Sequence, residues 1–133
     1  MKMLLISHGK MAEGALNTLR IFTQAGDITA VSAYTDESDD PGTEVTDFFE
    51  KAGDERVIAF SDIVFGSVNQ LLFPYLERHE TYVFSGFNLP MLLQATALSD
   101  ESSPEEIAAI AEEGRNGVVD MKNYNTDTDD EDE

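Results

Sequence analysis

The sequence predicts an α/β fold, with a doubly wound, mostly parallel sheet of strand order 2-1-3-4 and helices on both faces. The order of strand-like and helix-like segments predicts it. Short apolar runs typical of buried strands alternate with longer segments of helical periodicity along the whole chain, and strand–helix repeats with right-handed crossovers form such sheets. The length of 133 residues suits one domain that buries roughly two thirds of the surface of the unfolded chain.

The first half of the chain supplies three expected strands and two helices. A strand over 3–6 precedes a helix over 11–24, which places its apolar residues on one face and ends near Gly26. The next strand covers 28–34. A helix over 44–52 then leads to a third strand over 56–61, and Asp62 follows at the carboxyl end of that strand.

The second half continues the alternation. A helix over 67–77 leads to a strand over 81–84, and a turn-rich segment then opens into another helix after Pro90. The last helix runs to about Glu113 and begins at an N-cap serine, Ser103, with Pro104 at its first position and Glu106 placed for a capping box. Residues 117–121 are too few for a helix and predict a C-terminal edge strand. Residues 1–124 therefore form the expected single domain.

Composition and charge restrict the partners. The formal charge of -19, from 27 acidic and 8 basic residues, would repel nucleic acid and anionic lipid. The chain has no cysteine, so disulfides and thiolate zinc sites are excluded. No apolar run approaches the length of a membrane span and no signal peptide is recognisable. We expect a cytoplasmic protein without metal or cofactor.

Two acidic clusters are expected to be solvated. Residues 125–133 carry like charges without apolar partners and predict a disordered acidic tail. Residues 36–40 precede a Pro-Gly pair and predict a surface loop. The loop lacks the glycine and terminal glutamate of an EF-hand.

His8 is the first candidate for chemistry, because it stands where the first apolar run ends and Gly9 opens a helical pattern. In a sheet of order 2-1-3-4, strands 1 and 3 are neighbours whose connections leave on opposite faces, which opens a crevice at their carboxyl ends. Asp62 ends the third strand at the same edge. A carboxylate that accepts the N–H of one imidazole nitrogen leaves the other nitrogen free as a nucleophile.

The same crevice has features of a phosphate site. Helices are expected to begin after Gly9 and after Gly66 and Ser67, and helix N-termini bind anions through their N–H groups. Lys10 is the only basic residue close in sequence, so backbone N–H groups and the Ser67 hydroxyl would do most of the binding. The other histidine, His79, lies at a polar helix end and is expected to be a surface residue.

Four blocks in this order, over residues 1–121, resemble the IIA component of the mannose-type (mannose, fructose, sorbose) phosphoenolpyruvate-dependent sugar phosphotransferase system. They are Ser7-His8-Gly9 with Ala12-Glu13-Gly14, Ser61-Asp62 with Gly66–Gln70, Gly86–Met91, and Gly114–Val118. Each block alone is a weak signal, but together and in register they are specific.

The resemblance implies a phosphoryl carrier. His8 would accept a phosphoryl group from the phosphocarrier HPr and pass it to a IIB protein or domain, and the membrane components IIC and IID would be reached only indirectly. It implies that Asp62 orients His8, and that Ser67 with the nearby amides of Gly9, Gly66 and Val68 contacts the phosphate. It further implies a homodimer in which residues 117–121 form an antiparallel strand on the partner's sheet.

Phe65 departs from the family pattern, since many relatives have a glycine there; its side chain would narrow the mouth of the site or restrict the turn.

The sequence leaves two other functions open. One is the phosphohistidine subunit of a dihydroxyacetone kinase system, and the other is a regulatory binding protein on the same fold. The sequence does not indicate which sugar is transported, because a IIA component contacts only other carrier proteins.

Overall fold

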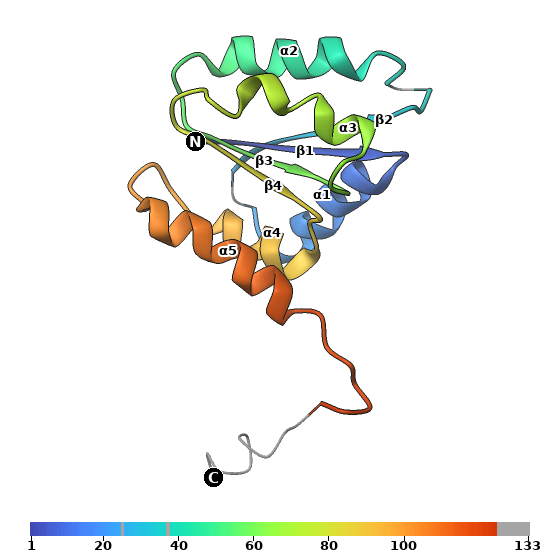
Figure 1. Cartoon of the computed structure of the whole chain (residues 1–133), viewed down its shortest axis with the longest axis vertical. Coiled ribbons are helices and arrows are strands. Elements are labelled where there is room, and N and C mark those ends of the chain that lie inside the picture. Colours follow the sequence, from blue (N-terminus) through green and yellow to red (C-terminus); the bar gives the residue numbers. More distant parts are fainter. Residues whose placement is uncertain (25, 37, 125–133) are drawn as a thin grey trace.

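Four parallel strands in the order β2-β1-β3-β4 form the centre of the protein (Figure 1). The computed structural model describes residues 1–24, 26–36 and 38–124. In register, Ile6 of β1 lies opposite Val31 of β2 and Ser61 of β3. The strands are β1 (Lys2–His8), β2 (Asp27–Ala33), β3 (Val57–Ser61) and β4 (Thr81–Ser85). The predicted strand order is confirmed.

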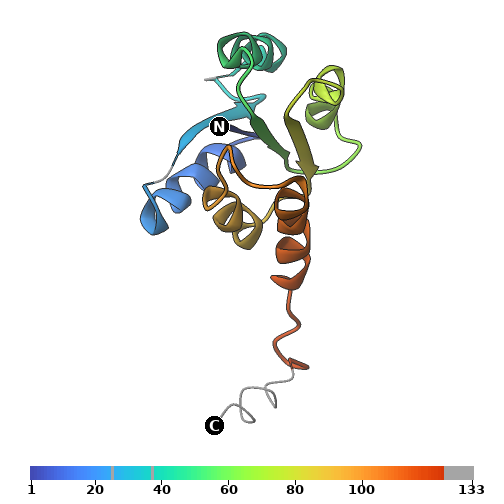
Figure 2. The same ribbon diagram turned by 90° about the vertical axis from the view of Figure 1, so that its left-hand side faces the viewer.

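Helices cover both faces of the sheet, as predicted. Figures 1 and 2 show α2 and α3 above the strands and α1, α4 and α5 below them. The helices are α1 (Met11–Phe22), α2 (Pro41–Ala52), α3 (Ser67–Gln70), the 3-10 turn η1 (Phe73–Tyr75), α4 (Leu89–Thr96) and α5 (Pro104–Asn116). None of the helices in the described part of the chain is long and apolar enough to cross a lipid bilayer.

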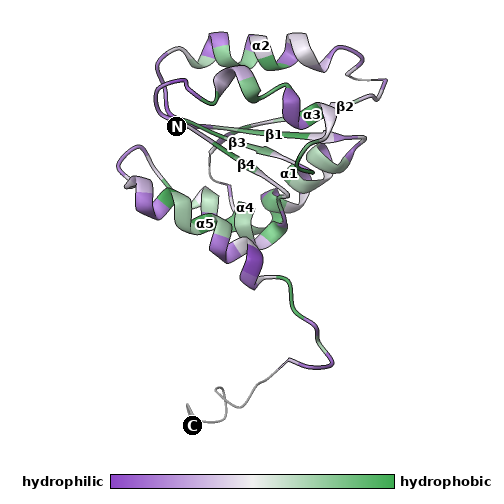
Figure 3. Ribbon diagram, viewed as in Figure 1, coloured by the Kyte–Doolittle hydropathy of each residue, from purple (hydrophilic) through white to green (hydrophobic). Residues whose placement is uncertain are grey.

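The core consists of two apolar layers, one on each side of the sheet. Leu5 and Phe60 point to the layer shared with α1, α4 and α5, whereas Leu4 and Ala59 point to the layer shared with α2 and α3. Strands buried on both faces need apolar residues at successive positions, and Figure 3 shows much of β1 and β3 in the apolar colour. The near-continuous apolar run of β1 follows from this burial.

Helix starts follow from capping residues. Ser103 accepts a hydrogen bond from the Glu106 N–H and the Glu106 side chain accepts one from the Ser103 N–H, so the predicted capping box is confirmed. Asp40 accepts a hydrogen bond from the Thr43 N–H and caps α2, which begins at Pro41 rather than at 44. A proline is favourable at the first helical position because its missing N–H has no helical acceptor there.

Two expected elements differ from the structure. The helix expected over 67–77 is divided into α3 and η1, because Pro74 cannot donate a backbone hydrogen bond and starts a new turn. The antiparallel edge strand expected over 117–121 is not formed within the described chain. That segment leaves the end of α5 and runs away from the sheet, so it has no strand beside it (Figures 1 and 2). The acidic tail, 125–133, lies outside the described residues.

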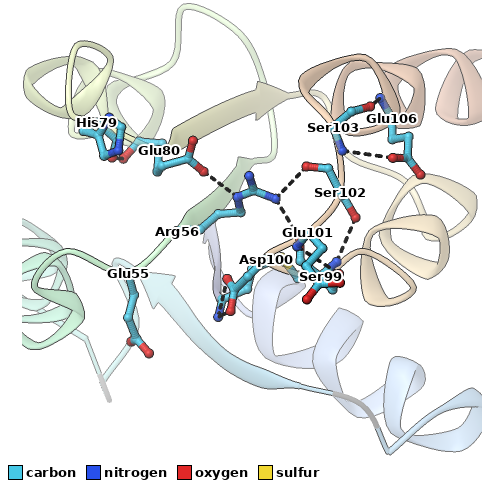
Figure 4. A network of polar contacts seen from close by, with 12 residues as sticks. Glu55, Arg56, His79, Glu80, Ser99, Asp100, Glu101, Ser102, Ser103 and Glu106 are labelled. Atoms are coloured by element: carbon cyan, nitrogen blue, oxygen red, sulfur yellow. Dashed lines mark hydrogen bonds and ion pairs between the residues drawn. The ribbon is translucent and has the colours of Figure 1, made fainter.

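Arg56 joins the amino-terminal edge of the sheet to the loop between α4 and α5 (Figure 4). Its Nε donates to Glu80 Oε2 at 2.6 Å, and its Nη1 donates to the carbonyls of Ser99 at 2.7 Å and Ser102 at 2.9 Å. The side chain is only 10% exposed. A guanidinium suits this site because its donors point in several fixed directions.

Substitution of Arg56 tests this connection. Arg56→Lys keeps the charge but cannot reach the Glu80 carboxylate and both carbonyls with the same geometry, so the free energy of unfolding should fall by about 1–3 kcal/mol. Urea denaturation followed by circular dichroism measures the loss. Arg115→Lys is the matched control, because Arg115 pairs with Glu112 on the exposed surface of α5 and such pairs contribute little. Equal stabilities of the two variants would contradict the assigned role of Arg56.

Candidate active site

His8 and Asp62 meet at the carboxyl ends of β1 and β3. Asp62 Oδ2 accepts hydrogen bonds from the His8 backbone N–H at 2.8 Å and from His8 Nδ1 at 2.9 Å. The other carboxylate oxygen accepts the Ile63 N–H at 2.9 Å. An ionised carboxylate can only accept, so Nδ1 carries a proton, and in the neutral imidazole Nε2 keeps its lone pair. The structure thus brings together the two residues that the sequence singled out.

The charge state of Asp62 follows from its surroundings. Partial burial acts to raise the pKa of its carboxyl group, but the hydrogen bonds from the backbone and ring of His8, with the attraction to the imidazole, outweigh burial. The pKa of Asp62 is therefore below its ordinary value of 3.8. The carboxylate is ionised at neutral pH and stabilises positive charge on the ring.

The start of α3 lies against the outer edge of the His8 ring. Ser67 Oγ is 3.4 Å from His8 Nε2, which places a hydroxyl beside the nitrogen that holds the lone pair. Gly66 lets the chain pass this close, because a Cβ there would lie 3.1 Å from His8 Cε1 and 3.0 Å from Ile63 Cγ2. A side chain at 66 would therefore force the His8 ring or the Ile63 side chain to shift by a few tenths of an ångström.

Buried hydroxyl and amide groups hold α3 in this place. Ser61 Oγ donates to Asn69 Oδ1 at 2.7 Å and lies 2.8 Å from Ser85 Oγ. Ser61 is fully buried and Asn69 nearly so. Buried polar groups need partners, so this cluster ties α3 to the ends of β3 and β4. The sequence contained both residues within a family block but did not indicate their pairing.

Three backbone N–H groups around the start of α1 donate hydrogen bonds within the chain. The Gly9 N–H donates to the Ala33 carbonyl at 2.9 Å, and the Ala12 and Glu13 N–H groups donate to the hydroxyls of Ser7 and Ser32. Gly9 also has a φ of +62°, a conformation that glycine adopts without strain. Gly9 therefore contributes the turn that ends β1.

Tyr34, which follows β2, belongs to the site although the sequence reasoning missed it. Its Oη lies 2.8 Å from Ser67 Oγ, and its ring centroid lies 5.6 Å from that of His8. β2 is adjacent to β1, so its end reaches the same edge of the sheet. The predicted strand order contained a signal for this residue, because it placed the end of β2, and so Tyr34, beside the end of β1 and His8.

Phe65 and His79 are both exposed. Phe65 has a φ of +66° and is 83% exposed, so it projects into solvent. His79 precedes β4 at the opposite edge of the sheet and is exposed, as predicted. In the described ranges, no three histidine, aspartate or glutamate side chains gather into a metal-binding group.

Comparison with known families assigns the chain. The family described as the fructose IIA component of the sugar phosphotransferase system matches residues 2–112. The chain belongs to this family. As a IIA-type chain it is a component of a sugar phosphotransferase system, with a role in phosphotransfer.

Solved structures share the fold of this IIA-type chain. A Klebsiella pneumoniae protein described as a phosphoenolpyruvate-dependent sugar phosphotransferase system permease superposes with a TM-score of 0.82 at 23% identity, covering 92% of this chain and 91% of that one. A mannose/sorbose-specific IIA subunit from Enterococcus faecalis superposes with a TM-score of 0.72 at 23% identity, and the match covers 89% of this chain and 92% of that one.

A IIA protein associated with the fucose utilisation operon of Streptococcus pneumoniae superposes with a TM-score of 0.71 at 25% identity, and the match covers 91% of this chain and 93% of that one. These structures agree with the IIA family in fold. No curated protein sequence matches the chain significantly.

Acid titration tests the Asp62 hydrogen bonds. Because the pKa of Asp62 is lower in the folded than in the unfolded chain, its stabilisation is complete above the unfolded value and is lost as the pH falls through the folded one. Asp62→Asn should cost about 1–3 kcal/mol at pH 5, since one amide oxygen replaces two carboxylate oxygens. The difference in unfolding free energy between the two proteins should shrink as the pH falls below 3.8 and through the lower pKa of folded Asp62. A constant difference over this range would contradict the ionised pair.

Proposed function

We propose that this IIA-type protein is a phosphohistidine carrier, in which His8 accepts a phosphoryl group from HPr and passes it to a IIB protein or domain. The observation that carries the proposal is the His8 Nδ1 hydrogen bond to Asp62 at 2.9 Å. It directs the lone pair of Nε2 outward on a ring whose side chain is 42% exposed. A protein partner can therefore reach the nucleophile.

Each transfer exchanges one phosphorus–nitrogen bond for another. The lone pair of His8 Nε2 attacks phosphorus, the bond from phosphorus to the donor's histidine nitrogen breaks, and that nitrogen recovers its electron pair. His8 keeps the Nδ1 proton, so its phosphorylated ring is cationic and the Asp62 carboxylate stabilises it. Transfer to IIB reverses these steps with a new acceptor, and no proton has to leave the pair.

The start of α3 is the proposed phosphate-binding element. The Ser67 hydroxyl lies beside Nε2, and the N–H groups of Ser67 and Val68 are in the first turn of α3, where a helix has no acceptors of its own. Gly66 allows the close approach. We expect these groups to bind the phosphoryl oxygens, while Gly9 shapes the turn under the ring.

Partner proteins would dock on the apolar rim of the site. Ile63, Val64 and Phe65 are all at least half exposed, as is Met11 at the start of α1. Exposed apolar residues grouped beside a reactive centre are typical of protein-binding surfaces. The proposal includes a homodimer in which residues 117–121 pair with the partner's sheet, supported by the exposed Val118 and Met121 side chains.

Phosphorylation of single-histidine variants tests the carrier function. With phosphoenolpyruvate, enzyme I and HPr, the wild-type protein should acquire one acid-labile phosphoryl group, and His8→Ala should lose it completely. His79→Ala is the matched control and should be labelled like wild type. Radioactive phosphate or a mobility shift on phosphate-affinity gels measures the label.

Three outcomes would overturn the carrier proposal. They are labelling that persists in His8→Ala, labelling that requires His79, and no label with a competent HPr.

Asp62→Asn should remain folded but transfer phosphate at least tenfold more slowly, since the charge that stabilises the cationic ring is gone. Transfer to a dihydroxyacetone kinase in place of a IIB protein would assign the chain to that other system.

A further inference from the structure

We propose that Tyr34 is a further positioning residue of this site, and that its hydroxyl orients the Ser67 hydroxyl toward His8 Nε2 and, after transfer, toward the phosphoryl group. The proposal rests on the proposed phosphocarrier function and goes beyond the His8–Asp62 pair. It is carried by the contact of 2.8 Å between Tyr34 Oη and Ser67 Oγ. It assigns a role to the end of β2, which otherwise only borders the site.

Counting hydrogens gives the direction of each hydrogen bond. The Asp62 carboxylate accepts from His8 Nδ1–H, so His8 Nε2 is an acceptor and Ser67 must donate to it. A serine hydroxyl has a single hydrogen, which this bond uses. The remaining contact of Ser67 can therefore only be a bond in which Tyr34 O–H donates. The result is one continuous series of donors from Tyr34 through Ser67 and His8 to Asp62.

The backbone around Tyr34 keeps its hydroxyl near Ser67. Tyr34 has a φ of +64°, a strained conformation for a residue with a Cβ. Its N–H donates to the Ser38 carbonyl at 3.0 Å, and the Thr35 hydroxyl donates to the Ser32 carbonyl at 2.7 Å. These bonds hold the turn, and strain of this kind persists where the surroundings require a particular geometry.

The consequence appears when His8 is phosphorylated. The lone pair of Nε2 then forms the bond to phosphorus, so it can no longer accept from Ser67. The Ser67 hydroxyl turns its hydrogen to a phosphoryl oxygen, and the Tyr34 O–H still donates to Ser67 Oγ. A donor to Oγ makes Ser67 a stronger donor itself. Tyr34 thus acts on the phosphoryl group through Ser67. Only the phosphoryl group is transferred, and the protons stay within the series.

Removal of one oxygen atom tests the role of Tyr34. Tyr34→Phe keeps the ring beside His8 and should lower the single-turnover rate constant of transfer from phospho-HPr about tenfold, while the half-saturating HPr concentration changes less than twofold. Ser67→Ala should reduce the rate by at least as much, and Tyr34→Phe should have no further effect in that background. Tyr75→Phe is the matched control, since Tyr75 stacks on Phe49 in the α2 layer.

A second readout needs no phosphoryl donor. In the unphosphorylated protein, the 15N chemical shift of His8 Nε2 should move in Tyr34→Phe and in Ser67→Ala, but the double variant should match Ser67→Ala. This result would support the series of hydrogen bonds even if the wild-type protein were not phosphorylated. Failure of the wild-type protein to be phosphorylated would overturn only the carrier function. Independent rate losses of the two variants, a change confined to HPr affinity, or an unmoved Nε2 resonance in Tyr34→Phe would each overturn the role of Tyr34.

Discussion

The hydrogen bond from His8 Nδ1 to Asp62 is the interaction on which the rest of the site depends. One carboxylate oxygen binds both the backbone N–H and the ring of His8, so the same contact closes the end of β1 and selects the tautomer. Every other feature follows from the lone pair that remains at Nε2. In the proposed series Ser67 donates to it and Tyr34 donates to Ser67, and the ring is partly exposed.

The topology of the sheet makes this contact possible. His8 and Asp62 are far apart in sequence, but β1 and β3 are neighbouring parallel strands, so their carboxyl ends meet. α1 leaves β1 on one face and α3 leaves β3 on the other (Figure 2), which opens the edge between them. Arg56 and its partners stabilise the opposite edge of the sheet, so these hydrogen bonds are separated from His8.

Much of this arrangement could be predicted from the sequence, because periodicity and strand order are encoded locally. The strand order and the meeting of His8 with Asp62 are confirmed, and the Ser103 capping box follows from a short motif. Strand order places Tyr34 at the same edge of the sheet as His8, but its contact with Ser67 was missed because that contact depends on a left-handed turn that sequence periodicity does not reveal. The strand expected over 117–121 has no neighbour within the described chain, and its pairing would require a second chain.

The central claim is that His8 reacts through Nε2 while Nδ1 keeps its proton on Asp62. Heteronuclear NMR of the 15N-labelled, phosphorylated protein tests this claim most directly. We expect phosphorus–nitrogen coupling to Nε2 of His8, together with a protonated Nδ1 whose resonance moves in Asp62→Asn. Coupling of phosphorus to Nδ1, or a phosphoryl group on any other side chain, would contradict the account.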